Sequence, residues 1–493
     1  MSDQPSMATR LVALAEDAQL FHDGDVAYAR VMQSGHYEQW PVRSKAFRRW
    51  LGHLFYLSEE RAPNSQAMQD AITVLEGQAI FRGPQVTTHL RVAYFDGCIY
   101  LDLCDDDWQV VRIAPHRWRL IASDNCPVRF RRSKAMKRLP APVRGGSLDE
   151  LKTFLNTDDN DDFALVVSWL IGAFRPGYPT PILVLNGEQG SAKSTTSRLL
   201  RSLVDPKDAP LRAEPRDPRD VAVAANNSHI VALDNLSRVA TWLSDSMCRL
   251  ATGGGFSTRA LYTDDEEAIF DALRPVMVNG IDDLATRGDL LDRALCVTLP
   301  RINDDKRKTE SSLRQSFDDA QPRLLGAICD ALCVALQRVG SVPMTQIPRM
   351  ADFAEWIVAA EPALPWDEGR FLKAYTGNRE SVHELAIESS PVGPVVRQFA
   401  DQLIGGTWTG KAGELLDRLN DTAGDSARKQ KGWPTKAASL GSTLRRLAPN
   451  LRALGVDVRF ERSKHGRTIT VNALRKVTQN AVTAVTAVTT PAD

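Results

Sequence analysis

The sequence predicts an α/β protein with a separate small C-terminal domain, and three observations lead to this prediction. At residues 181–203 an apolar strand runs directly into a glycine-rich loop and then a helix. From residue 147 to about residue 359, helices alternate with short apolar strands, as they do around an open α/β sheet. After residue 390, three helical stretches precede two strands of alternating polarity, which indicates a separate small domain.

These changes of pattern divide the chain into four parts. We expect an α+β accessory domain at residues 1–145, the nucleotide-binding core at 146–385, a small C-terminal domain at 386–476 and a flexible tail at 477–493. The tail repeats Ala, Val and Thr without an amphipathic period, so it has no face with which to pack.

The bulk composition narrows the class of protein. Lys plus Arg and Asp plus Glu both number 61, which excludes a globally basic nucleic-acid coat protein but allows local basic patches. The longest apolar stretch, residues 163–174, is too short to span a membrane and predicts a buried helix. The polar start at residues 1–10 argues against a signal peptide. The sequence therefore predicts a cytoplasmic protein with no membrane partner.

The cysteines favour reduced thiols, because they form no Cys-x-x-Cys pair. A zinc site built from Cys98, Cys104, Cys126 and His116 is the weaker interpretation, since the spacing matches no common ligand pattern.

The N-terminal part predicts helices near residues 6–18, 44–57 and 65–78, then an antiparallel meander over 99–121. Within the meander, residues 105–107 are three aspartates. They are compatible with the paired metal-binding carboxylates of a primase, but a hairpin turn is required there and is the favoured interpretation. A basic run follows, and contact with a phosphate backbone and a merely solvated surface both stay open for it. The run consists of Arg129, Arg131, Arg132, Lys134, Lys137 and Arg138.

The glycine-rich loop has the composition of a phosphate-binding loop. Its glycines let backbone N–H groups curl around phosphate oxygens, Lys193 supplies a charge to the β- and γ-phosphates, and Ser194 offers a hydroxyl to Mg²⁺. Ala192 stands where this motif usually has glycine, which makes binding a firmer expectation than hydrolysis. The predicted nucleotide-binding residues are Gly187, Glu188, Gln189, Gly190, Ser191, Ala192, Lys193, Ser194 and Thr195.

A second apolar strand, residues 229–233, delivers Asp234 and Asn235 at its carboxyl end. Asp234 is expected to hold the Mg²⁺ shell together with Ser194. Asn235 cannot take a proton, so it would orient the attacking water, or a base such as Glu188 would act instead. The structural alternative is that Asp234 caps a helix starting at Asn235.

A third strand, residues 274–278, ends at Asn279, whose side chain is expected to reach the γ-phosphate or its water. Before a fourth strand, residues 294–299, lie Arg293 and Arg287, the first and second candidates for an arginine donated to a neighbouring subunit's nucleotide. Either arginine could instead pair with Asp289 or Asp292.

The order of these motifs resembles superfamily 3 helicases, and more closely the poxvirus-type helicase ATPases of phages and plasmids. The resemblance covers residues 151–302 and rests on the order of the elements rather than on one motif. It implies a P-loop, AAA+-like core that uses ATP and Mg²⁺. It also implies that Asn279 is the sensor asparagine and that residues 253–262 lead into a pore-lining hairpin. Arg259 would then contact DNA phosphates, with Tyr262 nearby. Ala192 and Asn235 depart from the family pattern and put the rate of hydrolysis in doubt.

The C-terminal domain predicts a winged helix, because three helices precede a two-stranded hairpin. It carries about twice as many basic as acidic residues, so DNA binding is the leading expectation and a protein adaptor the alternative. The predicted DNA contacts are Lys436, Arg445, Arg446 and Arg452 on the recognition helix and Lys464 and Arg467 at the wing tip.

Together these features predict a cytoplasmic ATP-dependent DNA helicase or translocase from a mobile genetic element. It would act as a homo-oligomer, most simply a ring of six, on single- and double-stranded DNA. If priming is needed, we expect another chain to supply the primase. The alternative is an ATP-gated DNA-binding switch, a replication initiator or defence regulator that hydrolyses ATP slowly without unwinding. A metabolic kinase would not explain the basic C-terminal domain.

Overall fold

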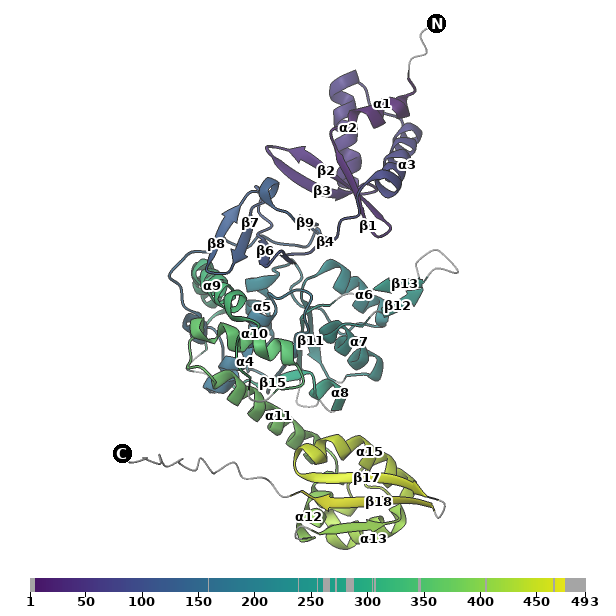
Figure 1. The fold of residues 1–493 in the computed structure, drawn as a ribbon, viewed down its shortest axis with the longest axis vertical. Coiled ribbons are helices and arrows are strands. Elements are labelled where there is room, and N and C mark those ends of the chain that lie inside the picture. The colour runs from purple at the N-terminus through teal and green to yellow at the C-terminus, as the bar shows by residue number, and fades with distance from the viewer. Residues whose placement is uncertain are drawn as a thin grey trace, which may run out of the picture. The chain divides into compact units, whose positions relative to one another are not determined.

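The computed structural model describes two compact units, Met1–Asn378 and Arg379–Asp493 (Figure 1). Within the described residues the protein is a mixed α/β protein, and none of the helices is both long enough and apolar enough to cross a membrane. The described ranges are 5–157, 159–237, 239–254, 256–259, 267–270, 273–280, 288–303, 305, 307–344, 347–403, 406–463 and 466–474.

The chain starts with a small layer of helices and strands. Phe47, Leu51 and Phe55 line one face of the second helix and are fully buried against the other elements. The three helices were predicted, whereas the antiparallel sheet β1-β2-β3 was not. The elements are α1 Met7–Leu14, β1 Gln19–Asp23, β2 Val26–Gln33, β3 His36–Pro41, α2 Lys45–Glu59 and α3 Ser65–Arg82.

The predicted meander is confirmed as a four-stranded antiparallel sheet in the order β5-β6-β7-β8. Residues 105–107 form the connection between β6 and β7, so the turn interpretation is confirmed. Asp102, at the end of β6, pairs with Arg132 at 2.6 Å, so part of the basic run serves an internal contact. The strands are β5 Val92–Phe95, β6 Cys98–Asp102, β7 Val110–Ala114 and β8 Arg117–Ile121, with the short parallel pair β4 Thr88–His89 and β9 Arg129–Phe130.

A four-stranded parallel sheet forms the centre of the first unit, in the order β11-β14-β10-β15. All five residues of β10 and of β14 are buried, as expected for a parallel sheet covered by helices on both faces. The strands are β10 Ile182–Asn186, β11 Val231–Leu236, β14 Val276–Gly280 and β15 Ala294–Thr298. The helices around them are α4 Asn160–Gly172, α5 Lys193–Val204, α6 Pro218–Asn227, α7 Thr241–Thr252, α8 Gly288–Leu291, α9 Glu310–Arg338 and α10 Ala351–Ala360.

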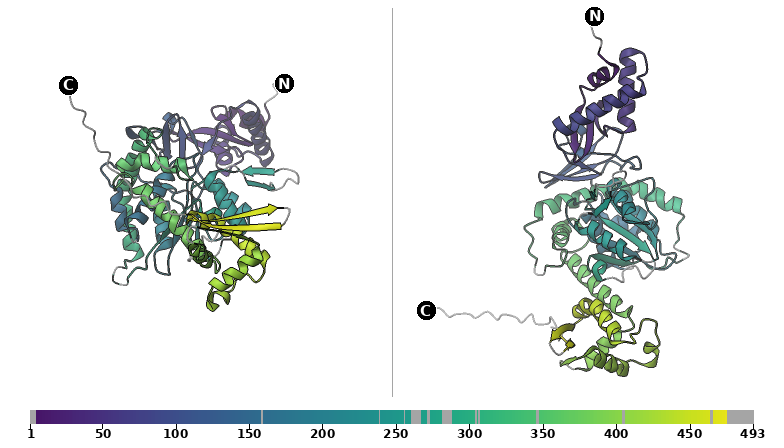
Figure 2. Two further views of the ribbon diagram at one scale, coloured as in Figure 1. Left: turned by 60° about the horizontal axis from the view of Figure 1, so that its bottom comes forward. Right: turned by 90° about the vertical axis from the view of Figure 1, so that its right-hand side faces the viewer.

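Two strands leave this core as a separate hairpin. β12 Phe256–Arg259 and β13 Glu267–Phe270 pair antiparallel, between α7 and β14 in sequence. The views in Figures 1 and 2 both show the hairpin projecting from the body of the core.

A buried ionic cluster joins the β5–β8 sheet to the core. Asp205 follows the last turn of α5, and its carboxylate lies 3.6 Å from both the Arg91 Nε and the Arg201 Nη2. All three side chains are at most 1% exposed. Burial alone would raise the pKa of Asp205, but the charges of Arg91 and Arg201 outweigh it and hold the pKa below its usual value. The carboxylate therefore stays charged and fixes the end of α5 against the sheet.

The second unit packs three longer helices against a three-stranded antiparallel sheet in the order β16-β18-β17. Its core contains Leu415, Leu440, Leu444 and Val471, each fully buried. The three helices and the hairpin were predicted, and strand β16 is an addition. α11 Arg370–Glu388 runs across the boundary between the units. The other elements are α12 Gly393–Gln402, β16 Thr407–Gly410, α13 Ala412–Thr422, α14 Asp425–Arg428, α15 Ala437–Ala453, β17 Val456–Ser463 and β18 Gly466–Ala473.

Candidate nucleotide site

The loop between β10 and α5 has the backbone of an anion-binding loop. Gly187, Gly190 and Ala192 all have positive φ, at +142°, +87° and +64°. A side chain at Gly187 would place its Cβ 2.5 Å from the Leu299 carbonyl oxygen, so glycine is required there by space as well as by conformation. Ala192 occupies the left-handed region in which glycine is preferred, and this explains why the motif usually has glycine at that position.

The two side chains after the loop are held by contacts that a phosphate or a cation could exchange. Lys193 Nζ donates to the carbonyl oxygens of Gly187 at 2.5 Å and Glu188 at 2.8 Å. Ser194 Oγ donates to Asp234 Oδ1 at 2.7 Å. The Asp234 side chain is half-buried, and β11 continues through it to Leu236. The alternative in which Asp234 caps a helix starting at Asn235 is therefore wrong.

Asn279 lies between the loop helix and the end of β11. Its side chain is 1% exposed; Oδ1 accepts from the Asn235 backbone N–H at 2.9 Å and Nδ2 donates to Ser197 Oγ at 2.9 Å. The sheet order places β14 between β10 and β11, so Asn279 joins the strand of Asp234 to the helix of Lys193. Asn235 has a φ of +55° and is exposed, as is Glu188.

The oxygen atoms at this edge suit a hard cation. The Ser194 hydroxyl and the Asp234 carboxylate lie within one hydrogen bond of each other, and both are ligand types that Mg²⁺ accepts. Among the described residues no three His, Cys, Asp or Glu side chains gather as a metal cluster. An ion held here would complete its shell with water and phosphate oxygens, which is the usual arrangement for Mg²⁺ at a nucleotide.

Arg293 lies at the opposite edge of the sheet. Its carbonyl oxygen accepts from the Ile182 N–H, at the beginning of β10, whereas the loop leaves the other end of that strand. Five strand residues separate the two positions by ~13 Å or more, so Arg293 does not contact the loop of its own chain. Asp292, one of its suggested partners, forms an ion pair with Arg349. Arg287 lies outside the described residues, and of Arg259 only the backbone in β12 is described.

The sequence analysis missed a group of cations that follows β15 and lies against the loop. The Ile302 N–H donates to the Gly190 carbonyl at 3.3 Å, and Asn156 Nδ2 donates to the carbonyls of Ser191 at 3.2 Å and Pro300 at 2.5 Å. The Arg307 Nη2 lies 3.5 Å from the position a Cβ would take at Gly190. No strand-end motif marks these residues, so only the fold reveals them.

A cavity of about 700 Å³ adjoins the loop at this place. Its volume falls within the range of small-ligand sites, and its lining mixes cations, amides and an aromatic ring. Lining residues besides the loop include Phe154, Asn156, Arg301, Asn303, Arg307 and Lys308. The arrangement could hold the base and ribose of a nucleotide whose phosphates lie on the loop.

In the second unit, most of the predicted DNA contacts are exposed. Lys436 precedes α15, and Arg445 and Arg446 lie on its outer face. The Arg445 guanidinium lies 5.0 Å from the centre of the Phe460 ring. Arg467 is exposed at the start of β18, and Lys464 lies outside the described residues. Arg452 is also exposed, and its guanidinium pairs with Asp457 at 2.9 Å.

The fold defines a mixed α/β protein with a parallel central sheet and a glycine-rich loop at its carboxyl edge. Residues 148–386 match the family model of the actinomycete integrative conjugative element replication protein, and residues 392–485 match the model of the C-terminal domain of the same RepA proteins. The two ranges together make up more than half of the chain. The chain belongs to this family of mobile-element replication proteins.

No curated protein matches the chain. Among solved structures, "The A form apo structure of NrS-1 C terminal region-CTR" is 11% identical with a TM-score of 0.39, covering 94% of this chain and 98% of that one. "The apo structure of NrS-1 C terminal region (305-718)" is 11% identical with a TM-score of 0.40, covering 96% and 100%. Scores at this level do not by themselves establish a common fold.

Proposed function

We propose that the protein is an ATP-dependent DNA helicase or translocase that acts in the replication of its mobile element. The observation that carries this proposal is the 2.7 Å contact between Ser194, in the first turn of helix α5, and Asp234, in strand β11, which meet beside a loop of the P-loop type. The family membership supports a role in replication, and the motif order supports an AAA+-like ATPase of superfamily 3 type.

The residues of this chain would act mainly by positioning and by charge. Lys193 would exchange its two carbonyl acceptors for phosphate oxygens, at little cost because it is already held beside the loop. The backbone N–H groups at the start of α5 would bind phosphate oxygens in the same way. Asn279, fixed by Ser197, would hold the Asp234 strand in register with α5. Mg²⁺, bound near Ser194 and Asp234, would supply charge neutralisation of the phosphates.

The site would be completed by a second copy of the chain. Arg293 is too far from its own loop, which fits an arginine donated to the nucleotide of a neighbour, with Arg287 as the second candidate. A closed homo-oligomer, most simply a hexamer, would repeat this seam around a ring.

DNA would be bound in two places. The β12–β13 hairpin projects from the core and carries Arg259, which supports a contact with a single strand in a central pore. The second unit would bind duplex DNA as a winged helix, through the exposed residues Lys436, Arg445, Arg446 and Arg467 together with Lys464.

One observation favours a second candidate function. Asn235 is exposed at the edge where a general base would stand, and an amide cannot accept a proton from water. A slow ATPase that oligomerises on ATP and switches DNA binding, such as a replication initiator or defence regulator, would tolerate this residue.

A strand-displacement assay separates the two candidates. The wild-type protein is compared with Lys193→Ala and Arg259→Ala on a forked duplex, with and without ATP. Unwinding that requires ATP and is lost in both variants supports a motor. DNA binding that responds to ATP, with no unwinding by the wild type, supports the switch and rejects the helicase.

A further inference from the structure

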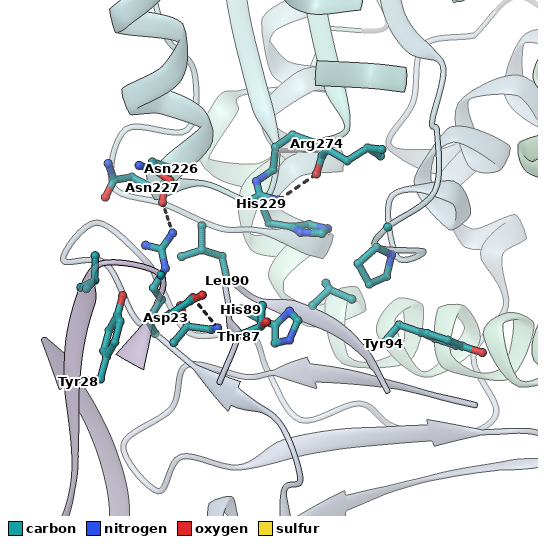
Figure 3. Close-up of a pocket in the computed structure, with 18 of the residues that line it drawn as sticks. Asp23, Tyr28, Thr87, His89, Leu90, Tyr94, Asn226, Asn227, His229 and Arg274 are labelled. Carbon is teal, nitrogen blue, oxygen red and sulfur yellow. Dashed lines mark hydrogen bonds between the residues drawn. The ribbon is translucent and has the colours of Figure 1, made fainter. Parts of the chain in front are cut away.

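A second and larger cavity lies where the β4–β9 strands and the β1–β2 hairpin meet the core (Figure 3). Its volume is about 1380 Å³, which exceeds the range of about 300–1,000 Å³ that is usual for small-molecule sites. In Figure 3, His229 and Arg274 come from the core, and Thr87, His89 and Tyr94 come from the segment that faces them. The size of the cavity suits a segment of a polymer better than a metabolite.

Two arginines in this cavity are held by backbone carbonyls. Arg131 Nη2 donates to the Asn226 carbonyl at 2.6 Å. Arg274 Nε donates to the Ala225 carbonyl at 3.0 Å, and its Nη1 to the Leu273 carbonyl at 2.9 Å. Each guanidinium has five N–H donors. Among the described residues, the bonds given above use only some of these donors, so both guanidinium groups are held in place and keep further donors for an anion.

The positively charged side chains in the cavity repel one another. The pKa of Arg274 is lowered to about 10, first by burial and then by the charge of Arg131. Burial also lowers the pKa of His89, and both arginines add to that effect against the opposing charge of Asp23. Asp23 is itself bound by the N–H and hydroxyl of Thr88, at 2.7 and 2.6 Å. A bound anion would relieve this repulsion.

The cavity also has an exposed aromatic ring, and two of its lining residues follow the β12–β13 hairpin in the sequence. Tyr94 is 44% exposed on its wall, which leaves ring surface on which a base could stack. Leu273 and Arg274, which line the cavity, follow the end of β13 by three and four residues in the sequence. A single strand of nucleic acid that contacts the hairpin could pass from there into the cavity on the surface of the same chain.

We propose that this cavity binds a segment of single-stranded nucleic acid, with a phosphate between Arg131 and Arg274 and a base against Tyr94. The identity of the strand as DNA rests on the proposed function, whereas the binding site itself does not. A polymer is favoured over free phosphate because the cavity is large and combines cations with an aromatic surface.

The test measures binding of a labelled oligothymidylate to the full-length protein by fluorescence anisotropy, without nucleotide, over a range of salt concentrations. Arg131→Ala is expected to weaken binding about tenfold, and to reduce the slope of log K against log salt by about 0.7 for one lost phosphate contact. Arg131→Lys is expected to restore the slope, which a merely structural defect would not allow. The control is Arg119→Ala, because Arg119 is exposed on β8 away from the cavity lining.

A cross-linking experiment locates the bound oligonucleotide on the protein. An oligonucleotide carrying iodouracil is expected to cross-link to the peptide that contains Tyr94, and less so in Tyr94→Leu. Inorganic phosphate at constant ionic strength is expected not to displace the strand. Unchanged affinity and slope in Arg131→Ala, cross-links confined to residues 386–474, or displacement by phosphate would each overturn the inference. Cross-linking at Tyr94 in a protein that fails to unwind DNA would reject the helicase and keep this site.

Discussion

The two ends of strand β15 carry arginines that relate to the phosphate loop in opposite ways. Arg293 precedes the strand, at the edge of the sheet where β10 begins. Arg301 and Arg307 follow it and line the cavity beside the loop, with Arg307 close to Gly190. In the proposed function, Arg301 and Arg307 would serve the nucleotide of their own chain, whereas Arg293 would serve that of a neighbouring chain. The five residues of β15 would then separate these two roles.

The largest expected effect is at Arg293, which lies at the end of β15 that is far from the glycine-rich loop. Arg293→Ala should lower the ATPase kcat by about 10³-fold with little change in nucleotide affinity, because a donated arginine stabilises charge that develops in the transition state. The measurement is steady-state hydrolysis together with the Kd for a fluorescent ATP analogue. Mixing Arg293→Ala with Lys193→Ala protein should restore part of the activity, since some seams then combine an intact lysine with an intact arginine. Failure of mixing to restore any activity would place the arginine's role within one chain.

A substitution at Arg307, which follows β15 and lies beside the loop, should affect nucleotide binding rather than kcat. Arg307→Ala is expected to weaken nucleotide binding by about tenfold, the equivalent of one charge-assisted hydrogen bond of roughly 1.5 kcal/mol. Mixing with Lys193→Ala should not restore affinity, because the contact lies within one chain. Arg314→Ala on the exposed side of α9 is the matched control. Equal affinities for Arg307→Ala and this control would remove Arg307 from the site.

The next prediction concerns the close approach of Gly187, in the loop, to the Leu299 carbonyl, which follows β15. Gly187→Ala should destabilise the protein by about 1–3 kcal/mol, because the new Cβ would lie 2.5 Å from the Leu299 carbonyl and the residue has a φ of +142°. Thermal unfolding measures this, with Gly177→Ala as the control, since Gly177 also has positive φ but nothing within 4 Å. The difference between the two variants isolates the clash from the conformational strain.

The smallest effect concerns the residue before the lysine. Ala192→Gly should stabilise the folded protein slightly, by up to about 1 kcal/mol, as left-handed strain is removed and offset in part by the greater freedom of glycine in the unfolded chain. Ala412→Gly, at the first position of α13, should do the opposite. A fall in Tm for Ala192→Gly would contradict this expectation, because the strain relieved at this position would then be smaller than the entropic cost of glycine.

Features that depend on local pattern were predictable. The strand, loop and helix around Lys193, the aspartate turn at residues 105–107 and the helices of the second unit all follow from hydrophobic period and turn chemistry. The β1–β3 sheet was missed because its strands do not alternate strictly between apolar and polar residues; β2, for example, has five consecutive buried residues. Arg307 was missed because no motif surrounds it, and its proximity to Gly190 arises only when β15 pairs with β10. Sequence separation alone could not show which edge of the sheet an arginine would occupy.

The ionic cluster at Asp205 has a practical consequence for dissecting the molecule. A shortened chain beginning at residue 146 would retain Asp205 and Arg201 but lose Arg91, which is one of the two arginines that hold the carboxylate in its charged form. Loss of one partner from such a pair typically costs about 3–5 kcal/mol. The N-terminal segment is therefore not a removable appendage, and a fragment that begins at residue 146 is expected to express poorly for reasons unrelated to its glycine-rich loop.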